Sequence, residues 1–178
     1  MMECKRALEE AKGDLAEAEV VLRKRGIAAA GKKAARTTGQ GVIGSYIHPG
    51  AQLGVLLEVN CESDFVARTD DFRQLVHDIA MQIAALDPKF VRREDVTEAL
   101  LRKEREIQKE RALAEGKPPQ VAEKMVEGRM SKFYEEVCLY EQPFIKDGTL
   151  TIGQLIASLI AKIGENITVA RFVRFKVG

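Results

Sequence analysis

Residues 60–68 (NCESDFVAR) place a carboxylate beside an aromatic ring at a point where the core requires neither. Before them, residues 53–61 alternate between apolar and other side chains, which predicts a strand with one buried face. After them, apolar residues from Phe72 onward recur at helical spacing. Asp64 and Phe65 therefore fall in a joint between a strand and a helix, outside both periodicities. An aromatic at such an exposed joint suits insertion into a partner.

A second interpretation of Phe65 stays open on these grounds. Its ring could tuck beneath the following helix as a satellite of the core, as most large apolar side chains do. The pattern of residues does not decide between the two.

Other candidate motifs for chemistry are weaker. Residues 26–32 (GIAAAGK) match G-x-x-x-x-G-K, but Lys33 stands where a P-loop needs Ser or Thr to hold Mg²⁺, and a helix is expected before the loop instead of a strand. His48 and His77 have no nearby cysteine or carboxylate pattern typical of zinc. No triad order stands out. We therefore expect no catalytic residue, no metal, no cofactor and no enzymatic activity.

Composition and charge describe an ordinary globular protein. The chain has 178 residues, of which 46% are hydrophobic, and its 28 basic and 27 acidic side chains nearly cancel. Balanced charge argues against direct nucleic-acid binding, and no apolar run approaches the roughly 20 residues that span a bilayer. The three cysteines are widely spaced and form no disulfide framework. A cytoplasmic location, away from membranes, is the simplest expectation.

The N-terminal part is predicted to be helical. Residues 1–26 read as two short helices broken at Gly13, with Asp14 as a cap and Gly26 as the end of the second. Residues 27–40 read as a partly helical linker. The remainder, residues 41–178, is expected to form the core domain.

The core is predicted to mix strands and helices. Residues 42–47 and 53–61 form a hairpin through Pro49 and Gly50, whose order suits a type II turn. A third strand is expected over 167–177, with Ile167, Val169, Val173, Phe175 and Val177 on one face. Helices are expected over 70–86, capped by Thr69, then over 95–115, 120–139 and 152–163, the middle two forming a charged hairpin, with a turn at Asp147-Gly148. This is an α+β fold with a small antiparallel three-stranded sheet, packed with helices and a helical hairpin.

The sequence resembles the bacterial elongation factor Ts family along its whole length. The resemblance rests on several ordered motifs: MMECK at 1–5, residues 55–68, GKP at 116–118, AEKMVEGR at 122–129, EQPF at 141–144 and AKIGENI at 161–167. It looks like the short form of the family, without a long coiled-coil insertion. The family usually carries another helix before Met-Met, completing a ubiquitin-associated-like module, so residues 1–26 resemble an incomplete copy of it.

The resemblance implies a guanine-nucleotide exchange factor for elongation factor Tu. It assigns Ser63, Asp64, Phe65 and Val66 to displacing Mg²⁺ from the partner's nucleotide site, with Ser63 standing where the family usually has Thr. It also implies that Met1 and Met2 contact the same partner, and that two copies of the chain associate. The competing hypothesis is a ribosome-associated or structural binding protein that uses the charged hairpin.

Overall fold

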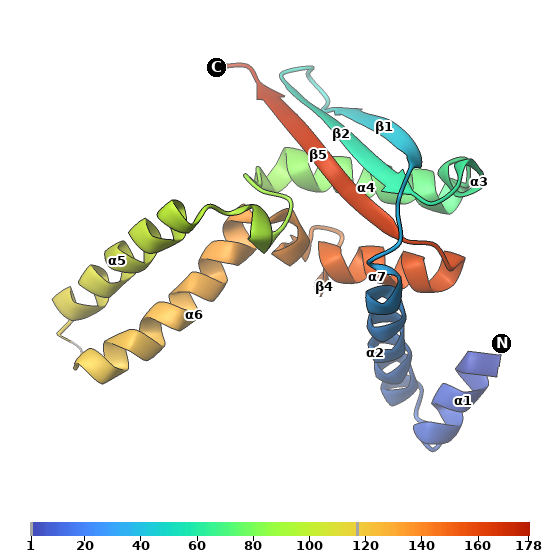
Figure 1. Ribbon diagram of the computed structural model, residues 1–178, viewed down its shortest axis with the longest axis horizontal. Coiled ribbons are helices and arrows are strands. Elements are labelled where there is room, and N and C mark those ends of the chain that lie inside the picture. Colours follow the sequence, from blue (N-terminus) through green and yellow to red (C-terminus); the bar gives the residue numbers. More distant parts are fainter. Residues whose placement is uncertain (1, 117) are drawn as a thin grey trace. The chain divides into compact units, whose positions relative to one another are not determined.

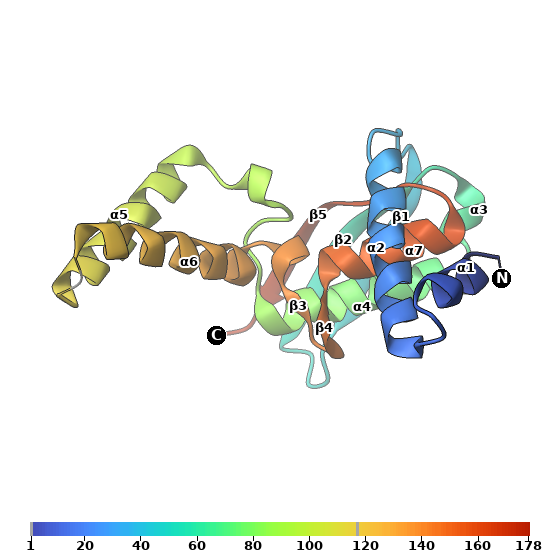
Figure 2. The ribbon, with the colours of Figure 1, turned by 90° about the horizontal axis from the view of Figure 1, so that it is seen from below.

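The structure, a computed structural model, describes residues 2–116 and 118–178. The chain divides into two compact units, Met1–Met81 with Gln154–Gly178, and Gln82–Gly153. The described residues form helices, a three-stranded sheet and a two-stranded sheet, so the predicted α+β class is confirmed (Figures 1 and 2). The finer division into a module at 1–26, a linker at 27–40 and a core at 41–178 stays a prediction.

The first unit is built around the three-stranded sheet. Its strands are β1 (Gln40–Ile47), β2 (Leu53–Cys61) and β5 (Ile167–Lys176), in the order β1-β2-β5 with antiparallel pairing throughout. On β2, the predicted alternation is confirmed, because Val55, Leu57 and Val59 are buried while Leu56 is exposed. The buried face of β2 meets α4 (Asp70–Leu86), which lies across the sheet in Figure 1.

The hairpin turn between β1 and β2 forms as predicted. The amide of Ala51 donates to the carbonyl of His48 at 2.9 Å, with Pro49 and Gly50 in the two central positions. Gly50 has a φ of 94°, the left-handed value that the second central residue of a type II turn requires.

The predicted single face of the third strand is wrong. Pairing of β5 with β2 shifts between Glu58 and Val59, because Glu58 pairs with Arg171 while Val59 pairs with Val169. Ala170 is thus the extra residue of a β-bulge, and everything after it changes face. Ile167 and Val169 are buried, whereas Val173 and Phe175, which share their parity, are exposed.

The N-terminal helices also depart from expectation. After α1 (Met2–Glu10), helix α2 runs from Leu15 to Lys33, so the end predicted at Gly26 is wrong. Asp14 caps α2 as predicted, accepting from the amide of Glu17 at 3.0 Å. A Cβ at Gly26 would lie 3.5 Å from the Cβ of Ala161, which places α2 against α7 (Ile152–Ile163). Gly26 therefore serves helix packing and does not end the helix.

The second unit contains the predicted helical hairpin. Helix α5 (Glu98–Ala114) follows a short 3-10 helix η1 (Arg93–Asp95), and α6 (Pro119–Val137) packs beside it before a second 3-10 helix η2 (Leu139–Glu141). The sequence analysis missed a small sheet formed by β3 (Pro143–Phe144) and β4 (Asp147–Thr151). Strand β4 begins at Asp147, where a turn was expected.

A buried amide holds the small sheet in place. Gln82 is fully buried, and its Nε2 donates to Gln142 Oε1 at 3.2 Å and to the Pro143 carbonyl at 3.1 Å. Its Oε1 accepts from the amide of Ile145 at 2.9 Å. These bonds satisfy a polar side chain that would otherwise be costly to bury.

Two helices match the predicted bounds, α4 and α7. Thr69 caps α4, since its hydroxyl accepts from the amide of Phe72 at 3.3 Å. Across residues 2–116 and 118–178, no helix combines the length and apolar character needed to cross a membrane.

The close approach of β1 to α4 gives a test of this packing. A Cβ at Gly44 would collide with Val76 Cγ1 and lie 2.9 Å from Leu57 Cδ2. We expect Gly44→Ala to lower the free energy of unfolding by about 1–3 kcal/mol through overpacking, measured by urea denaturation. The matched control is Gly128→Ala in α6, where a Cβ meets nothing within 4 Å; it should stabilise the chain by roughly 0.5–1 kcal/mol. Equal effects of the two substitutions would contradict the close approach.

Candidate functional site at the strand–helix joint

The joint between β2 and α4 is a single helical turn, α3 (Asp64–Ala67). Phe65 lies on this turn with 80% of its surface exposed. The interpretation in which its ring tucks beneath the helix is therefore wrong. Phe72, which begins the apolar stripe of α4, is by contrast fully buried. The structure thus separates the two aromatic residues into one that serves the core and one that faces solvent.

Asp64 is half-exposed, and its carboxylate is paired within its own turn. Its Oδ2 accepts from Arg68 Nη2 at 2.8 Å, and the side chains are 49% and 73% exposed respectively. An exposed pair of this kind contributes about 0–1 kcal/mol. The carboxylate can therefore exchange Arg68 for another partner at little cost.

Ser63 and Val66 support the turn. Ser63 is the N-cap of α3, and its Oγ accepts from the amide of Val66 at 3.4 Å. The side chain of Val66 is buried, with 7% of its surface exposed. Of the four predicted site residues, the structure therefore presents Asp64 and Phe65 to solvent and uses Ser63 and Val66 to build the turn.

The segment after α7 completes the site. It lies within the motif at 161–167 that supports the family resemblance, but no pattern in the sequence connected it to the joint. Both carboxylate oxygens of Glu165 accept from Ser63, Oε2 from the amide at 3.0 Å and Oε1 from the hydroxyl at 2.7 Å. In return, Glu62 Oε1 accepts from the amide of Asn166 at 2.6 Å. These residues are more than a hundred positions apart, so no local pattern could have joined them.

Cys61 packs under the same joint. Its thiol is fully buried and donates to the carbonyl of Ser63 at 3.1 Å. Burial is the main cause that raises the pKa of the Cys61 thiol, which keeps it protonated at neutral pH. It acts here as a buried donor that helps to fix the carbonyl.

The predicted N-terminal contact is described only in part. Met2 lies on α1 and is 63% exposed, as a partner contact requires. Met1 lies outside the described residues. The roles of both methionines stay predictions.

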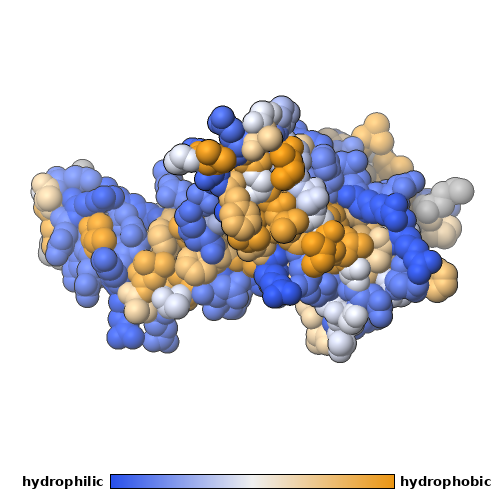
Figure 3. Space-filling model, turned by 90° about the horizontal axis from the view of Figure 1, so that it is seen from above, coloured by the Kyte–Doolittle hydropathy of each residue, from blue (hydrophilic) through white to orange (hydrophobic). Residues whose placement is uncertain are grey.

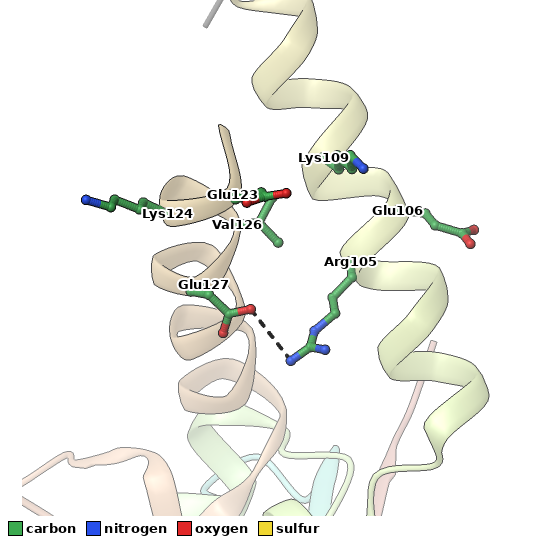
Figure 4. A pocket seen from close by; sticks show the side chains of 7 residues that line it. All are labelled: Arg105, Glu106, Lys109, Glu123, Lys124, Val126 and Glu127. Atoms are coloured by element: carbon green, nitrogen blue, oxygen red, sulfur yellow. Dashed lines mark ion pairs between the residues drawn. The ribbon is translucent and has the colours of Figure 1, made fainter. Parts of the chain in front are cut away.

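A groove between α5 and α6 is lined almost wholly by charged side chains, with Val126 the only apolar one, and Arg105 meets Glu127 at 3.7 Å (Figure 4). Lys124 and Glu106 point away from the groove in this view. Within the described residues, no group of three His, Cys, Asp or Glu side chains is arranged to hold a metal.

Fold and site together define an α+β protein that presents one aromatic and one carboxylate side chain from a short turn between a strand and a helix. The model of the family described as elongation factor TS matches residues 27–178. The chain belongs to the elongation factor Ts family, and by family it is a translation elongation factor of protein biosynthesis.

Its relatives support this assignment over the full length of the chain. It is 74% identical to elongation factor Ts of Solibacter usitatus, covering 100% of this chain and 84% of the relative. The corresponding protein of Koribacter versatilis is 65% identical, with 81% of its length covered. That of Carboxydothermus hydrogenoformans is 59% identical, with 82% covered.

The exposure of Phe65 predicts that its ring adds little to stability. Phe65→Ala should change the melting temperature by at most a degree or two, since its ring has few contacts to lose. Phe72→Ala is the matched control and should cost about 3–5 kcal/mol, because it empties a buried site. Both are measured by thermal unfolding followed by circular dichroism. A loss for Phe65→Ala as large as that for Phe72→Ala would mean that its ring belongs to the core.

Proposed function

We propose that this chain is a guanine-nucleotide exchange factor for elongation factor Tu, and that it promotes GDP release by disturbing the Mg²⁺ and phosphate site. The observation that carries the proposal is the exposed Phe65 on a turn whose backbone is held by hydrogen bonds, in a chain of this family. The reaction is a change of binding equilibrium and needs no covalent chemistry.

Thermodynamic linkage sets what the chain must do. An exchange factor binds its GTPase more tightly when the nucleotide is absent, so it must weaken nucleotide binding by the same factor. Mg²⁺ is the sensitive point, since it demands near-ideal octahedral geometry. A small displacement of the groups around the metal is therefore enough to loosen the phosphates.

Phe65 is suited to produce that displacement. Its ring is 80% exposed in the free chain, so insertion into an apolar pocket would remove nearly all of that surface from water. Burying a Phe side chain contributes about 1.5–3 kcal/mol. That energy becomes available only if the pocket opens, and opening can be coupled to a distorted nucleotide site.

Asp64 precedes Phe65 in the chain and would act on the polar groups around Mg²⁺ in the partner's nucleotide site. Its pairing with Arg68 is exposed and weak, so it can reorganise in the complex. Ser63 and Val66 would support both side chains from beneath, and Met1 and Met2 would add a separate contact to the same partner.

Removing the Phe65 ring should abolish most of the acceleration. We expect Phe65→Ala to lower catalysed release of a fluorescent GDP analogue from elongation factor Tu by about 10- to 100-fold, for a loss of roughly 1.4–2.8 kcal/mol. The measurement is stopped-flow fluorescence over a range of factor concentrations. An exchange rate within twofold of the unaltered chain would exclude Phe65 as the side chain whose insertion drives GDP release.

The same assay separates Asp64 from Phe65. Asp64→Ala should also slow release, and its deficit should shrink when free Mg²⁺ is chelated, because no metal then remains to be displaced. The Phe65→Ala deficit should persist under chelation in larger part. Arg68→Ala serves as the control, since it frees the carboxylate without removing it.

The competing function, a ribosome-associated or structural binding protein, makes a different prediction for the unaltered chain. It would leave GDP release unchanged at saturating concentrations. The charged hairpin of α5 and α6 would then be the contact surface.

We also propose that two copies of the chain associate through the sheet. The face of the sheet opposite α4 carries four exposed apolar side chains. They are Ile43 (67% exposed), Leu56 (46%), Val173 (42%) and Phe175 (65%). Figure 3 shows hydrophobic side chains gathered over part of the surface. Both β1 and β5 are also edge strands of the sheet.

Sedimentation tests the association. At tens of micromolar the chain should sediment as a dimer, and Phe175→Lys should shift it to monomer by placing a charge on the apolar face. Leu15→Lys on α2 is the control, because Leu15 is 72% exposed but is not part of the sheet. Only monomer for the unaltered chain would contradict the proposal.

A further inference from the structure

We propose that Glu165 is a positioning residue for GDP release: its carboxylate holds the α3 turn in the orientation that presents Phe65. The inference rests on the exchange function proposed above and deepens it. Glu165 lies in the segment between α7 and β5, outside the residues that the turn itself contributes.

The turn cannot hold its own orientation. Helix α3 has only four residues, and a helix this short is unstable unless other groups fix it. Phe65 makes little contact with the rest of the chain, because 80% of its surface is exposed. The direction of the ring therefore depends on how the backbone at the start of the turn is held.

Glu165 holds that backbone at its first residue. Its two carboxylate oxygens accept from the two donors of Ser63, at 3.0 Å from the amide and 2.7 Å from the hydroxyl. Hydrogen bonds to an ionised acceptor are roughly twice as strong as neutral ones. The two bonds together fix the position of Ser63 and its side-chain rotamer, and the hydroxyl can then cap α3 through Val66.

The neighbouring residues form the reverse contact. Glu62 Oε1 accepts from the amide of Asn166 at 2.6 Å, while Glu165 accepts from the amide of Ser63. Two adjacent residues on each segment thus exchange carboxylate-to-backbone bonds. A single contact would leave the turn free to rotate relative to the segment after α7. Contacts in both directions restrict that rotation.

The segment that contains Glu165 and Asn166 also contacts the chain that follows α2. Asn166 is buried, with 3% of its surface exposed, and its Nδ2 donates to the carbonyls of Ala34 at 3.3 Å and Arg36 at 2.9 Å. Arg36 in turn pairs with Glu62 at 3.5 Å. The chain that follows α2 and the turn that carries Phe65 are therefore anchored to one short segment.

Glu165→Ala tests the role of the carboxylate. We expect the maximal rate of GDP release at saturating factor to fall by about 10- to 100-fold, since a misplacement of about 1 Å is enough for such a loss. The concentration that gives half the maximal rate should change by less than about threefold, because the other contact surfaces remain. Glu165→Gln keeps the length of the side chain and should recover part of the rate.

A double substitution separates positioning from general destabilisation. If Glu165 acts only through the turn, Glu165→Ala with Phe65→Ala should release GDP no more slowly than Phe65→Ala alone. A loss that multiplies the two single effects would overturn the proposal. So would a normal rate for Glu165→Ala while Phe65→Ala is slow.

Two controls keep the result interpretable. Lys162→Ala removes an exposed ion pair with Asp71 (2.6 Å) near the end of α7, the helix that precedes Glu165. This substitution should leave exchange unchanged. If Glu165→Ala does not fold, Ser63→Ala removes one of the two bonds and must still lower the maximal rate. A normal rate for Phe65→Ala would overturn the proposal, because the turn would then present no side chain that release requires. The exchange function on which this inference rests is rejected by a different result, namely no acceleration of GDP release by the unaltered chain.

Discussion

Burial of one face of β2 against α4 is the constraint on which the exposed turn depends. Val55, Leu57 and Val59 from the strand and Phe72 and Ile79 from the helix are all almost completely buried, each at a contribution of about 1.5–3 kcal/mol. These contacts fix where the strand must end and where the helix must begin. Of the turn between them, Val66 and Ala67 are buried, while Phe65 is left outside the core. An aromatic can therefore be displayed there without weakening the packing beneath it.

Exposure alone does not make Phe65 an efficient contact, because a mobile ring loses conformational freedom when it inserts into a partner's pocket. A contact group that is already held in its bound orientation avoids much of that entropic cost. In this chain the restraint comes from charged acceptors in a distant segment, Glu165 above all, together with the cap of Ser63. The stable core and the presented side chains are thus connected by hydrogen bonds, while the Phe65 ring itself remains 80% exposed.

The sequence predicted those features that depend on local periodicity. The bounds of α4 and α7, the buried face of β2 and the location of the joint all follow from repeats of 3.6 or 2 residues. It failed where a distant contact decides. Gly26 resembles a helix end but packs near Ala161, and Glu165 meets Ser63 across 102 positions. Whether Phe65 was core or surface likewise required the three-dimensional arrangement.

The bulge in β5 lets residues of one parity serve both faces of the sheet. Ile167 and Val169 face the core, and because Ala170 is unpaired, Val173 and Phe175 of the same parity face outward. Deleting Ala170 would give a regular ladder and leave every other side chain on its present face, since Val169 and Arg171 already pair with the adjacent residues Val59 and Glu58. A one-residue deletion that removes a paired position of β5 would instead exchange the faces of the residues on one side of it. The two faces of this strand therefore depend on its paired positions and tolerate a change of length at the bulge.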